Sequence, residues 1–265
     1  MKIMVPRLFL DTEMASSFDT LLPKFEAGAF ASPFRSTVPL IAFAKDNWYG
    51  FKKLLSACGL SEEVEVHFEF KVSSPKGNGK PSHTDAMVLS TTHACAVEAK
   101  WTEPRYETVE KRLKRKDPKD PEGANAEAFV GGWLERLQPF ATKPLRLNDF
   151  SMAVYQMVHR AASASAISRS PSLIYLHFEF AEGSGGASTD QYHTDLTYLH
   201  NLLGNPLNFP FHLVEVRIRP TSAFSALEHL KKGSRETDLA VRSALLSERL
   251  FEFDETHIQT IGGQP

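Results

Sequence analysis

The chain has 265 residues, 42% of them hydrophobic, which is enough to bury a sizeable core in one elaborated domain or two small ones. Its 30 Lys and Arg residues against 32 Asp and Glu give a net charge of −2, which excludes a surface that coats nucleic acid everywhere. No stretch approaches the ~20 apolar residues of a membrane span, and Pro6 and Arg7 interrupt the N-terminal apolar run. We therefore expect a soluble, cytoplasmic protein without a membrane partner, with Cys58 and Cys95 reduced and buried.

The first third of the sequence predicts an arm, a helix and a strand. Residues 1–35 scatter Phe, Pro and Gly and are expected to form only an N-terminal arm. Apolar residues at helical spacing predict a helix over 37–60, with Gly59 as its C-terminal cap. Residues 63–74 alternate strictly and predict a half-exposed strand, in which one face carries Val64, Val66, Phe68 and Phe70.

Two further strands follow after short links. Residues 75–80 predict a hairpin turn. A phosphate-binding loop is the less suitable interpretation of this segment, because Pro81 occupies the position that such a loop needs as Ser or Thr. The tight connection at 90–92 separates a strand over 82–90 from one over 93–102, so three consecutive strands form an antiparallel meander. Residues 104–123 are almost all charged or Pro and predict a solvated insertion.

The remainder alternates helices and strands. The helix over 147–168 is expected to begin near Asn148 or Asp149 and to carry Met152, Tyr155, Gln156 and His159 along one stripe. The other expected elements are a helix over 124–141, a strand over 172–180, a helix over 189–203, a strand over 209–220, two short helices and a last strand over 249–257. The order predicts an α/β fold in which helices flank a mixed sheet. We expect a single domain over 36–265, with its core at 37–180 and a C-terminal elaboration at 181–265.

Three charged residues interrupt the two apolar strands of the meander. Alternation puts Glu98 and Lys100 on one face of their strand, after small alanines. A turn centred between residues 91 and 92 would pair residue 98 with residue 85, so Asp85 is expected beside Glu98. A register shift of one residue would instead place the Asp85 side chain on the other face of the sheet. Two neighbouring carboxylates repel each other unless a cation lies between them, and their hard oxygens suit Mg²⁺ or Mn²⁺. The alternative is a structural ion-pair cluster at the end of the sheet.

With "TDAMVL" and "AVEAKW" in this helix and strand order, the chain resembles the PD-(D/E)XK nuclease superfamily over roughly residues 37–180. The resemblance implies a restriction-endonuclease-like fold in which Asp85, Glu98 and the carbonyl of Ala99 bind the metal. It also implies that Lys100 activates or positions the attacking water and that Gln156 supports the site from the following helix. Thr84 stands where the family often has Pro, and the acidic residue of the first helix is unclear, with Asp46 the nearest fit and Glu62 or Glu63 past the helix end.

The resemblance predicts a Mg²⁺- or Mn²⁺-dependent nuclease acting on nucleic acid, with DNA as the expected substrate. The charge run at 110–119 is expected either to be a solvated face or to meet phosphates at the rim of the site. The predicted nucleic-acid contacts are Lys111, Arg112, Lys114, Arg115, Lys116 and Arg160. Two alternatives stay open: an inactive nuclease-like module that binds nucleic acid or a protein, and a sugar or nucleotide enzyme on an α/β scaffold. Oligomeric state is left open, a homodimer included.

Overall fold

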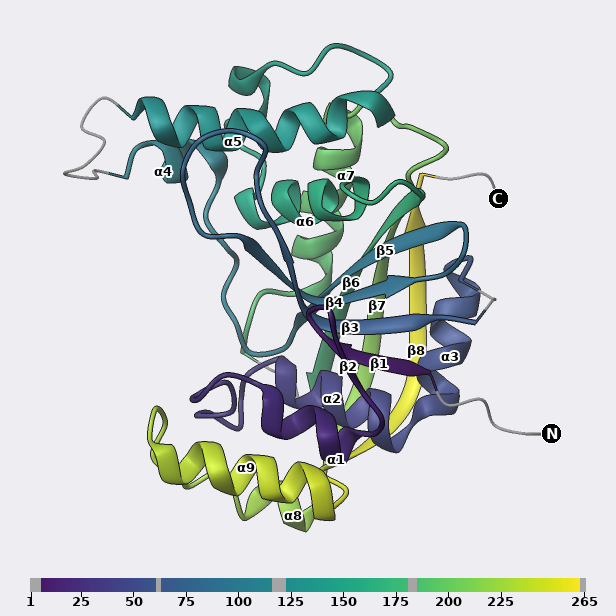
Figure 1. Ribbon diagram of the computed structural model, residues 1–265, viewed down its shortest axis with the longest axis vertical. Helices are drawn as coiled ribbons and strands as arrows, with labels where there is room; N and C mark the ends of the chain where they lie inside the picture. Colours follow the sequence, from purple (N-terminus) through teal and green to yellow (C-terminus); the bar gives the residue numbers. More distant parts are fainter. Residues whose placement is uncertain (1–5, 61–62, 116–122, 181–184, 263–265) are drawn as a thin grey trace.

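A single mixed sheet organises the described residues of the computed structural model, which are 6–60, 63–115, 123–180 and 185–262. Its eight strands lie in the order β2-β1-β3-β4-β5-β6-β7-β8 (Figure 1). Their bounds are β1 Arg7–Leu10, β2 Glu13–Ala15, β3 Glu65–Val72, β4 Ser82–Leu89, β5 His93–Lys100, β6 Ser170–Phe180, β7 Phe211–Pro220 and β8 Phe251–Ile261. The α/β class with a helix-flanked mixed sheet is confirmed.

The strand directions explain why the sheet is mixed. β3, β4 and β5 pair antiparallel through short links, which confirms the predicted meander. β5, β6 and β7 run parallel to one another, and helical crossovers connect them. β8 returns antiparallel to β7 at one edge of the sheet. The meander and the parallel strands therefore meet at β5, the strand that carries Glu98 and Lys100.

Helices cover both faces of the sheet (Figure 1). On one face lie α1 Phe18–Leu21, α2 Thr37–Asp46, α3 Trp48–Ala57, α8 Ser222–Ser225 and α9 Arg235–Ser247. On the other face lie α4 Val109–Leu113, α5 Ala124–Leu137, α6 Tyr155–Ser165 and α7 Thr189–Leu202. Short 3₁₀ turns occur at η1 Leu22–Lys24, η2 Gln138–Phe140 and η3 Leu147–Phe150. Among the described helices, none is long and apolar enough to cross a membrane.

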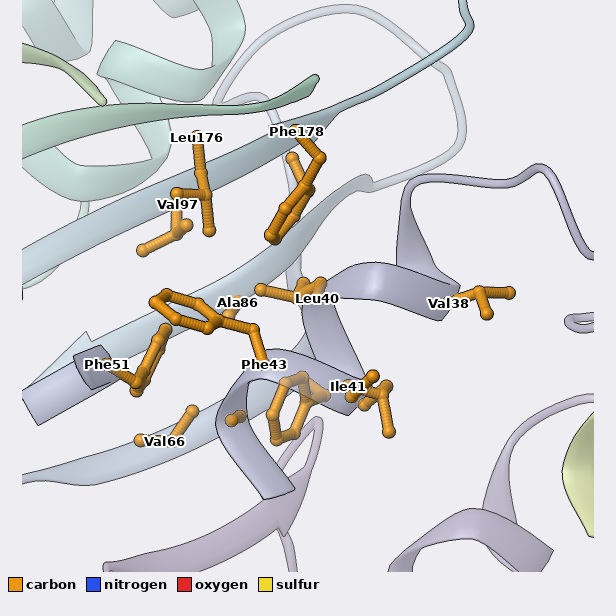
Figure 2. Close-up of a cluster of buried hydrophobic side chains, with 14 of the residues drawn as sticks. Val38, Leu40, Ile41, Phe43, Phe51, Val66, Ala86, Val97, Leu176 and Phe178 are labelled. Atoms are coloured by element: carbon orange, nitrogen blue, oxygen red, sulfur yellow. The ribbon is translucent and has the colours of Figure 1, made fainter. Parts of the chain in front are cut away.

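Each face of the sheet has its own apolar core. Figure 2 shows the first core, where Leu40 and Phe43 of α2 project toward Val97, Leu176 and Phe178 of the central strands. All five side chains are at most 1% exposed. The second core lies under α5, α6 and α7 and includes the alanines of β5 that precede Glu98. Because burying such side chains contributes about 1.5–3 kcal/mol each, the two cores hold the central strands rigidly.

The N-terminal segment differs from the expected arm. β1 pairs parallel to β3, and β2 pairs antiparallel to β1, so these residues extend the sheet instead of lying outside it. Leu8 and Ala15 of these short strands are buried. With only four and three residues, β1 and β2 are too short for periodicity to identify them.

Two expected helices are interrupted. The helix predicted over 37–60 divides at Asn47, whose side chain accepts a hydrogen bond from the Gly50 N–H at 3.2 Å and so caps α3. Gly59 ends α3 at a φ of +86°, which confirms the predicted cap. The helix predicted from 147 begins only at Tyr155, since Ala153 and Tyr155 form backbone hydrogen bonds with residues 107–109 and Val154 bridges to Thr108.

That bridge also anchors the segment expected to be a solvated insertion. Its first half runs against the start of α6 and then forms the short helix α4. The Val109 N–H donates to Ala153 O at 2.9 Å, and the Glu110 N–H donates to Ser151 O at 2.9 Å. Val109 itself is fully buried. The charged segment is therefore fixed beside α6 up to residue 115.

Candidate active site

Asp85 and Glu98 lie opposite each other where β4 and β5 separate. The paired residues Met87 with Ala96 and Ala86 with Val97 set a register whose next pair is Asp85 with Glu98, as the turn predicted. The Asp85 side chain accepts a hydrogen bond from the Ala99 N–H at 2.7 Å, so a carboxylate replaces the strand partner there. In an extended strand the N–H and C=O of one residue face the same neighbour. The Ala99 carbonyl therefore faces the Asp85 side as well.

In β3, the strand next to β4, the alternation of side chains between the two faces of the sheet shifts at Glu69. Val66 and Phe68 belong to the first core, whereas Phe70 and Val72 pack against the second, so the expectation that Phe70 shares a face with Val66 is wrong. The cause is local: Glu69 has a φ of +52°, a conformation that a non-glycine residue rarely adopts and that interrupts the pleat.

Glu69 brings a third carboxylate to this part of the sheet. It lies between the pairs Phe68 with Ala86 and Phe70 with Thr84, which is the position across from Asp85. Its carboxylate contacts the His83 ring at 3.5 Å. Burial raises the pKa of Glu69, although His83 opposes the shift, and the charge of Glu69 in turn contributes to the raised pKa of Asp85. Strict alternation had put Glu69 on a solvent face.

Glu98 is held between two cations of its own chain. Lys100 Nζ donates to Glu98 Oε1 at 2.6 Å, and Arg160 Nε donates to Oε2. Glu98 is 2% exposed, and Lys100 and Arg160 are each 7% exposed. Burial alone would raise the pKa of Glu98, but Arg160 and Lys100 together hold it below its usual value. A buried carboxylate needs such charged hydrogen-bond partners to offset the loss of hydration.

Arg160 ties the acidic pair to helix α6. Its Nη1 donates to Ser82 Oγ on β4, and it also approaches His159 Nδ1 at 3.2 Å. Ser82 Oγ lies 2.9 Å from the same imidazole nitrogen, and Ser163 donates to Ser82 at 3.4 Å. Burial and the neighbouring cation Arg160 push the pKa of His159 well below its usual value, so the ring is neutral and accepts the Arg160 hydrogen bond. This network fixes the guanidinium against Glu98.

The protonation states of Asp85 and Lys100 follow from the same surroundings. Burial and the charge of Glu98 raise the pKa of Asp85 well above its ordinary value. Burial alone would lower the pKa of Lys100, but Glu98 and Asp85 raise it above its usual range. Lys100 is therefore an ammonium at neutral pH, able to donate hydrogen bonds and unable to accept a proton. Ionisation of Asp85 costs more free energy than ionisation of an ordinary aspartate.

A cavity of about 790 Å³ opens over this cluster. Its wall includes Asp85, Glu98, Lys100, Gln156 and Arg160, and the remaining lining residues are Arg35, Ser36, Glu103, Pro104, Arg105, Tyr106, Glu107 and Arg115. The four predicted catalytic side chains, Asp85, Glu98, Lys100 and Gln156, therefore share one cavity. The first-helix acid does not join them: Asp46 ends α2, pairs with Lys45 at 2.8 Å and is absent from the lining, and Glu62 lies outside the described residues.

Gln156 lines the cavity. It is half-buried near the start of α6, and its Oε1 is buried without a hydrogen-bond partner among the described residues. Of its expected stripe, Tyr155 and His159 are buried and their rings lie 4.8 Å apart. Met152 is 57% exposed and precedes the helix, so its place on that stripe is wrong. A buried amide oxygen without a partner costs about 1–3 kcal/mol.

The residues of the predicted basic patch have different surroundings. Arg112 and Arg115 line cavities next to the cluster. Lys111 and Lys114 belong to neither cavity wall, and Lys114 pairs with Glu110 at 2.5 Å. Lys116 lies outside the described residues. Arg160 lines both cavities and is buried against Glu98.

Sequence reasoning missed the partners that fix this site. Glu103 accepts hydrogen bonds from the Ser36 N–H at 3.0 Å and the Trp101 N–H at 2.8 Å, which joins α2 to the end of β5. Ser82 and His159 carried no sequence feature that separated them from ordinary polar residues.

The donor set fits a hard divalent cation. Asp85, Glu98 and the Ala99 carbonyl are oxygen ligands of the kind that Mg²⁺ and Mn²⁺ take, with water completing the sphere. Burial and the charge of Glu98 raise the pKa of Asp85, and a bound cation would stabilise its ionised form. Among the described residues no group of three or more His, Cys, Asp or Glu side chains is placed to hold a metal ion, so the carbonyl would have to complete the set. Binding would require Glu98 to exchange a hydrogen bond to Lys100 or Arg160 for the metal.

Comparison with known proteins assigns a family without a function. Residues 13–207 match DUF6946, a domain of unknown function, and this match spans most of the chain and the whole acidic cluster. The chain belongs to the DUF6946 family. No curated protein and no solved structure matches it. The described part of this DUF6946 chain also has both cysteines free and buried, as predicted.

Proposed function

We propose that this DUF6946 protein is a divalent-metal-dependent phosphodiester hydrolase that acts on DNA. The main support is the pairing register of β4 and β5, which places Asp85 opposite Glu98, and the position of Lys100 in the wall of the same cavity. The restriction-endonuclease-like core of this proposal comprises α2 with α3, the meander β3–β4–β5, α6 and β6. The burial of Glu98 and Lys100 supports a chemical role, because a structural ion pair is more cheaply built at the surface.

The proposed roles follow from charge and position. Asp85, Glu98 and the Ala99 carbonyl would hold Mg²⁺ or Mn²⁺. When bound, the ion would polarise a phosphate oxygen and lower the pKa of a water molecule. Lys100, a cation, would donate a hydrogen bond to the attacking water or to a phosphate oxygen and would not abstract a proton. Gln156, which lines the same cavity, would use its amide N–H groups to orient the scissile phosphate or the water.

Arg160 has two tasks in this proposal. It neutralises Glu98 while no metal is bound, and it lines the cavity where phosphate would arrive. A guanidinium can exchange a carboxylate for a phosphate because its planar fork matches both. An incoming phosphate would thus draw Arg160 from Glu98 Oε2 and release that oxygen as a metal ligand.

A cleavage assay with matched variants tests the proposal. Purified protein is incubated with supercoiled and linear DNA in Mg²⁺, in Mn²⁺ and in EDTA. We expect cleavage only with metal, and a loss of roughly 10²–10³-fold or more in rate for Glu98→Gln, Asp85→Asn and Lys100→Met. Glu110→Gln, an exposed carboxylate outside the cavity, is the control and should cleave at the wild-type rate. Cleavage at the wild-type rate by the three site variants would contradict the assignment of Asp85, Glu98 and Lys100 as the active site.

One observation favours a second candidate, an inactive nuclease-like module that binds nucleic acid. Both oxygens of Glu98 already have hydrogen-bonded partners within the chain, so the cluster is satisfied without metal. Such a module would bind DNA with equal affinity in EDTA and in Mg²⁺ and would leave it intact. A filter-binding comparison of the two buffers therefore separates the candidates, since the enzyme should bind DNA more tightly when the metal is supplied as non-catalytic Ca²⁺.

A further inference from the structure

A second cavity of about 700 Å³ adjoins the acidic cluster. It lies between the β3–β4 hairpin loop and helices α5 and α6. Four residues line both this cavity and the one over the acidic pair, so the two cavities adjoin: Tyr106, Arg115, Gln156 and Arg160. An occupant of the second cavity therefore lies beside the wall that it shares with the cavity over Asp85 and Glu98.

The charge of this second cavity is one-sided. Lys80, Arg112, Arg115 and Arg160 line it, and the described residues of its wall include no Asp or Glu. Arg160 and Arg115 are paired with Glu98 and Glu107. In the described part of the chain, Lys80 and Arg112 have no carboxylate within ion-pair distance. In a protein with a net charge of −2, such a gathering of cations selects for a polyanion.

The cavity also offers an aromatic surface. Tyr106 is 44% exposed at the junction of the two cavities. Tyr155 forms part of the wall, with the Arg112 guanidinium over its ring at 5.4 Å. Single-stranded nucleic acids are bound by this combination, in which cations follow the backbone and bases stack on aromatic rings. Gln156 lines the same wall and belongs to both cavities.

The outer wall is built to stay in place. The Asn78 N–H donates to Asn125 Oδ1 at 2.6 Å, and Asn125 Nδ2 donates back to Asn78 O at 2.8 Å. A Cβ at Gly79 would lie 2.6 Å from the Phe129 ring, so the loop sits directly on α5. The cavity volume falls within the roughly 300–1,000 Å³ that encloses one small organic ligand, which suits a single unpaired nucleotide.

We propose that this second cavity binds an unpaired nucleotide, so that the enzyme acts on single-stranded DNA or on single-stranded ends and flaps. The proposal deepens the proposed function and rests on it for the cleavage step. Tyr106 stacks on the base, Lys80 and Arg112 contact the backbone phosphates, and the strand continues past Gln156. The next phosphodiester then lies over Asp85 and Glu98.

Binding without metal tests this proposal separately from cleavage. Fluorescence anisotropy in EDTA compares a labelled 12-nucleotide oligothymidylate with a blunt 12-base-pair duplex. We expect the single strand to bind more tightly, and Tyr106→Ala to weaken its binding roughly 5- to 150-fold. Tyr106→Phe should bind like the wild type. Tyr49→Ala is the control, because Tyr49 is 80% exposed and lines neither cavity.

Salt dependence checks the phosphate contacts. Lys80→Ala and Arg112→Ala should each reduce the slope of log affinity against log salt by about 0.7 for the single strand. A blunt duplex that binds as tightly as the single strand, or a Tyr106→Ala variant with wild-type affinity, would overturn the nucleotide subsite and leave the proposed hydrolysis standing. Single-strand binding through Tyr106 without any metal-dependent cleavage would overturn the hydrolysis and leave the subsite standing.

Discussion

The ion pair between Arg160 and Glu98 gives a quantitative stability prediction. Both side chains are buried, at 7% and 2% exposed, and Arg160→Gln would remove one partner. Breaking a buried pair in this way costs about 3–5 kcal/mol, because the remaining charge stays buried. Lys100 still donates to Glu98 Oε1, so the lower end of about 3 kcal/mol is expected. That is a large share of the roughly 5–15 kcal/mol that stabilises a typical protein.

Calorimetry and urea unfolding at pH 7.5 measure this change. For a chain of this size, about 3 kcal/mol corresponds to a fall in Tm of roughly 6–12 °C, with an unchanged urea slope. The double variant Glu98→Gln with Arg160→Gln should be more stable than the sum of the two single effects predicts, because neither charge is then left alone. A cost below about 1 kcal/mol, which is typical of exposed pairs, would refute the buried pair.

Three further outcomes follow from the same surroundings. Asp85→Asn should raise Tm at pH 7.5. Because the pKa of Asp85 is raised in the folded state, the ionised carboxylate lowers the free energy of unfolding at every pH above the unfolded pKa of ~3.9. The stability gained by the Asn variant should therefore vanish as the pH falls toward that value. A pH-independent difference would contradict this sign. Gln156→Ala should lower turnover strongly with little change in Tm, and Gln156→Leu should be equally inactive; cleavage preserved by leucine would remove Gln156 from the site. Gly79→Leu should lower Tm and weaken single-strand binding, since its side chain would meet the Phe129 ring; equal Tm would show that the loop is not seated on α5.

Local patterns were enough to predict the centre of the fold. Short turns on either side of β4 fixed an antiparallel meander, and the tight link before β5 fixed the pairing of Asp85 with Glu98. Alternation correctly assigned Glu98 and Lys100 to the face behind Ala94 and Ala96. These features depend on contacts between residues close in sequence, for which turn chemistry and pleating are sufficient.

The rest depends on contacts between distant residues. Arg160 reaches Glu98 only because α6 packs against β4 and β5, and one sequence cannot set the rotation of a helix on a sheet. Glu69 was misplaced because a single left-handed residue turned its strand, and no glycine marked the position. The start of α6 was misjudged because Val154 pairs with Thr108, a residue 46 positions earlier.

Metal uptake by the chain itself tests the central claim, the joint ligation of one divalent ion by Asp85 and Glu98, most directly. Unlike a cleavage assay, it cannot be reproduced by a trace of a contaminating nuclease. Electron paramagnetic resonance counts free Mn²⁺ during titration at pH 8, with a single-stranded oligonucleotide present to engage Arg160. The account predicts specifically bound Mn²⁺ on the wild type and on Glu110→Gln, and its loss in both Asp85→Asn and Glu98→Gln. Equal uptake by all four proteins, or none by the wild type, would contradict it.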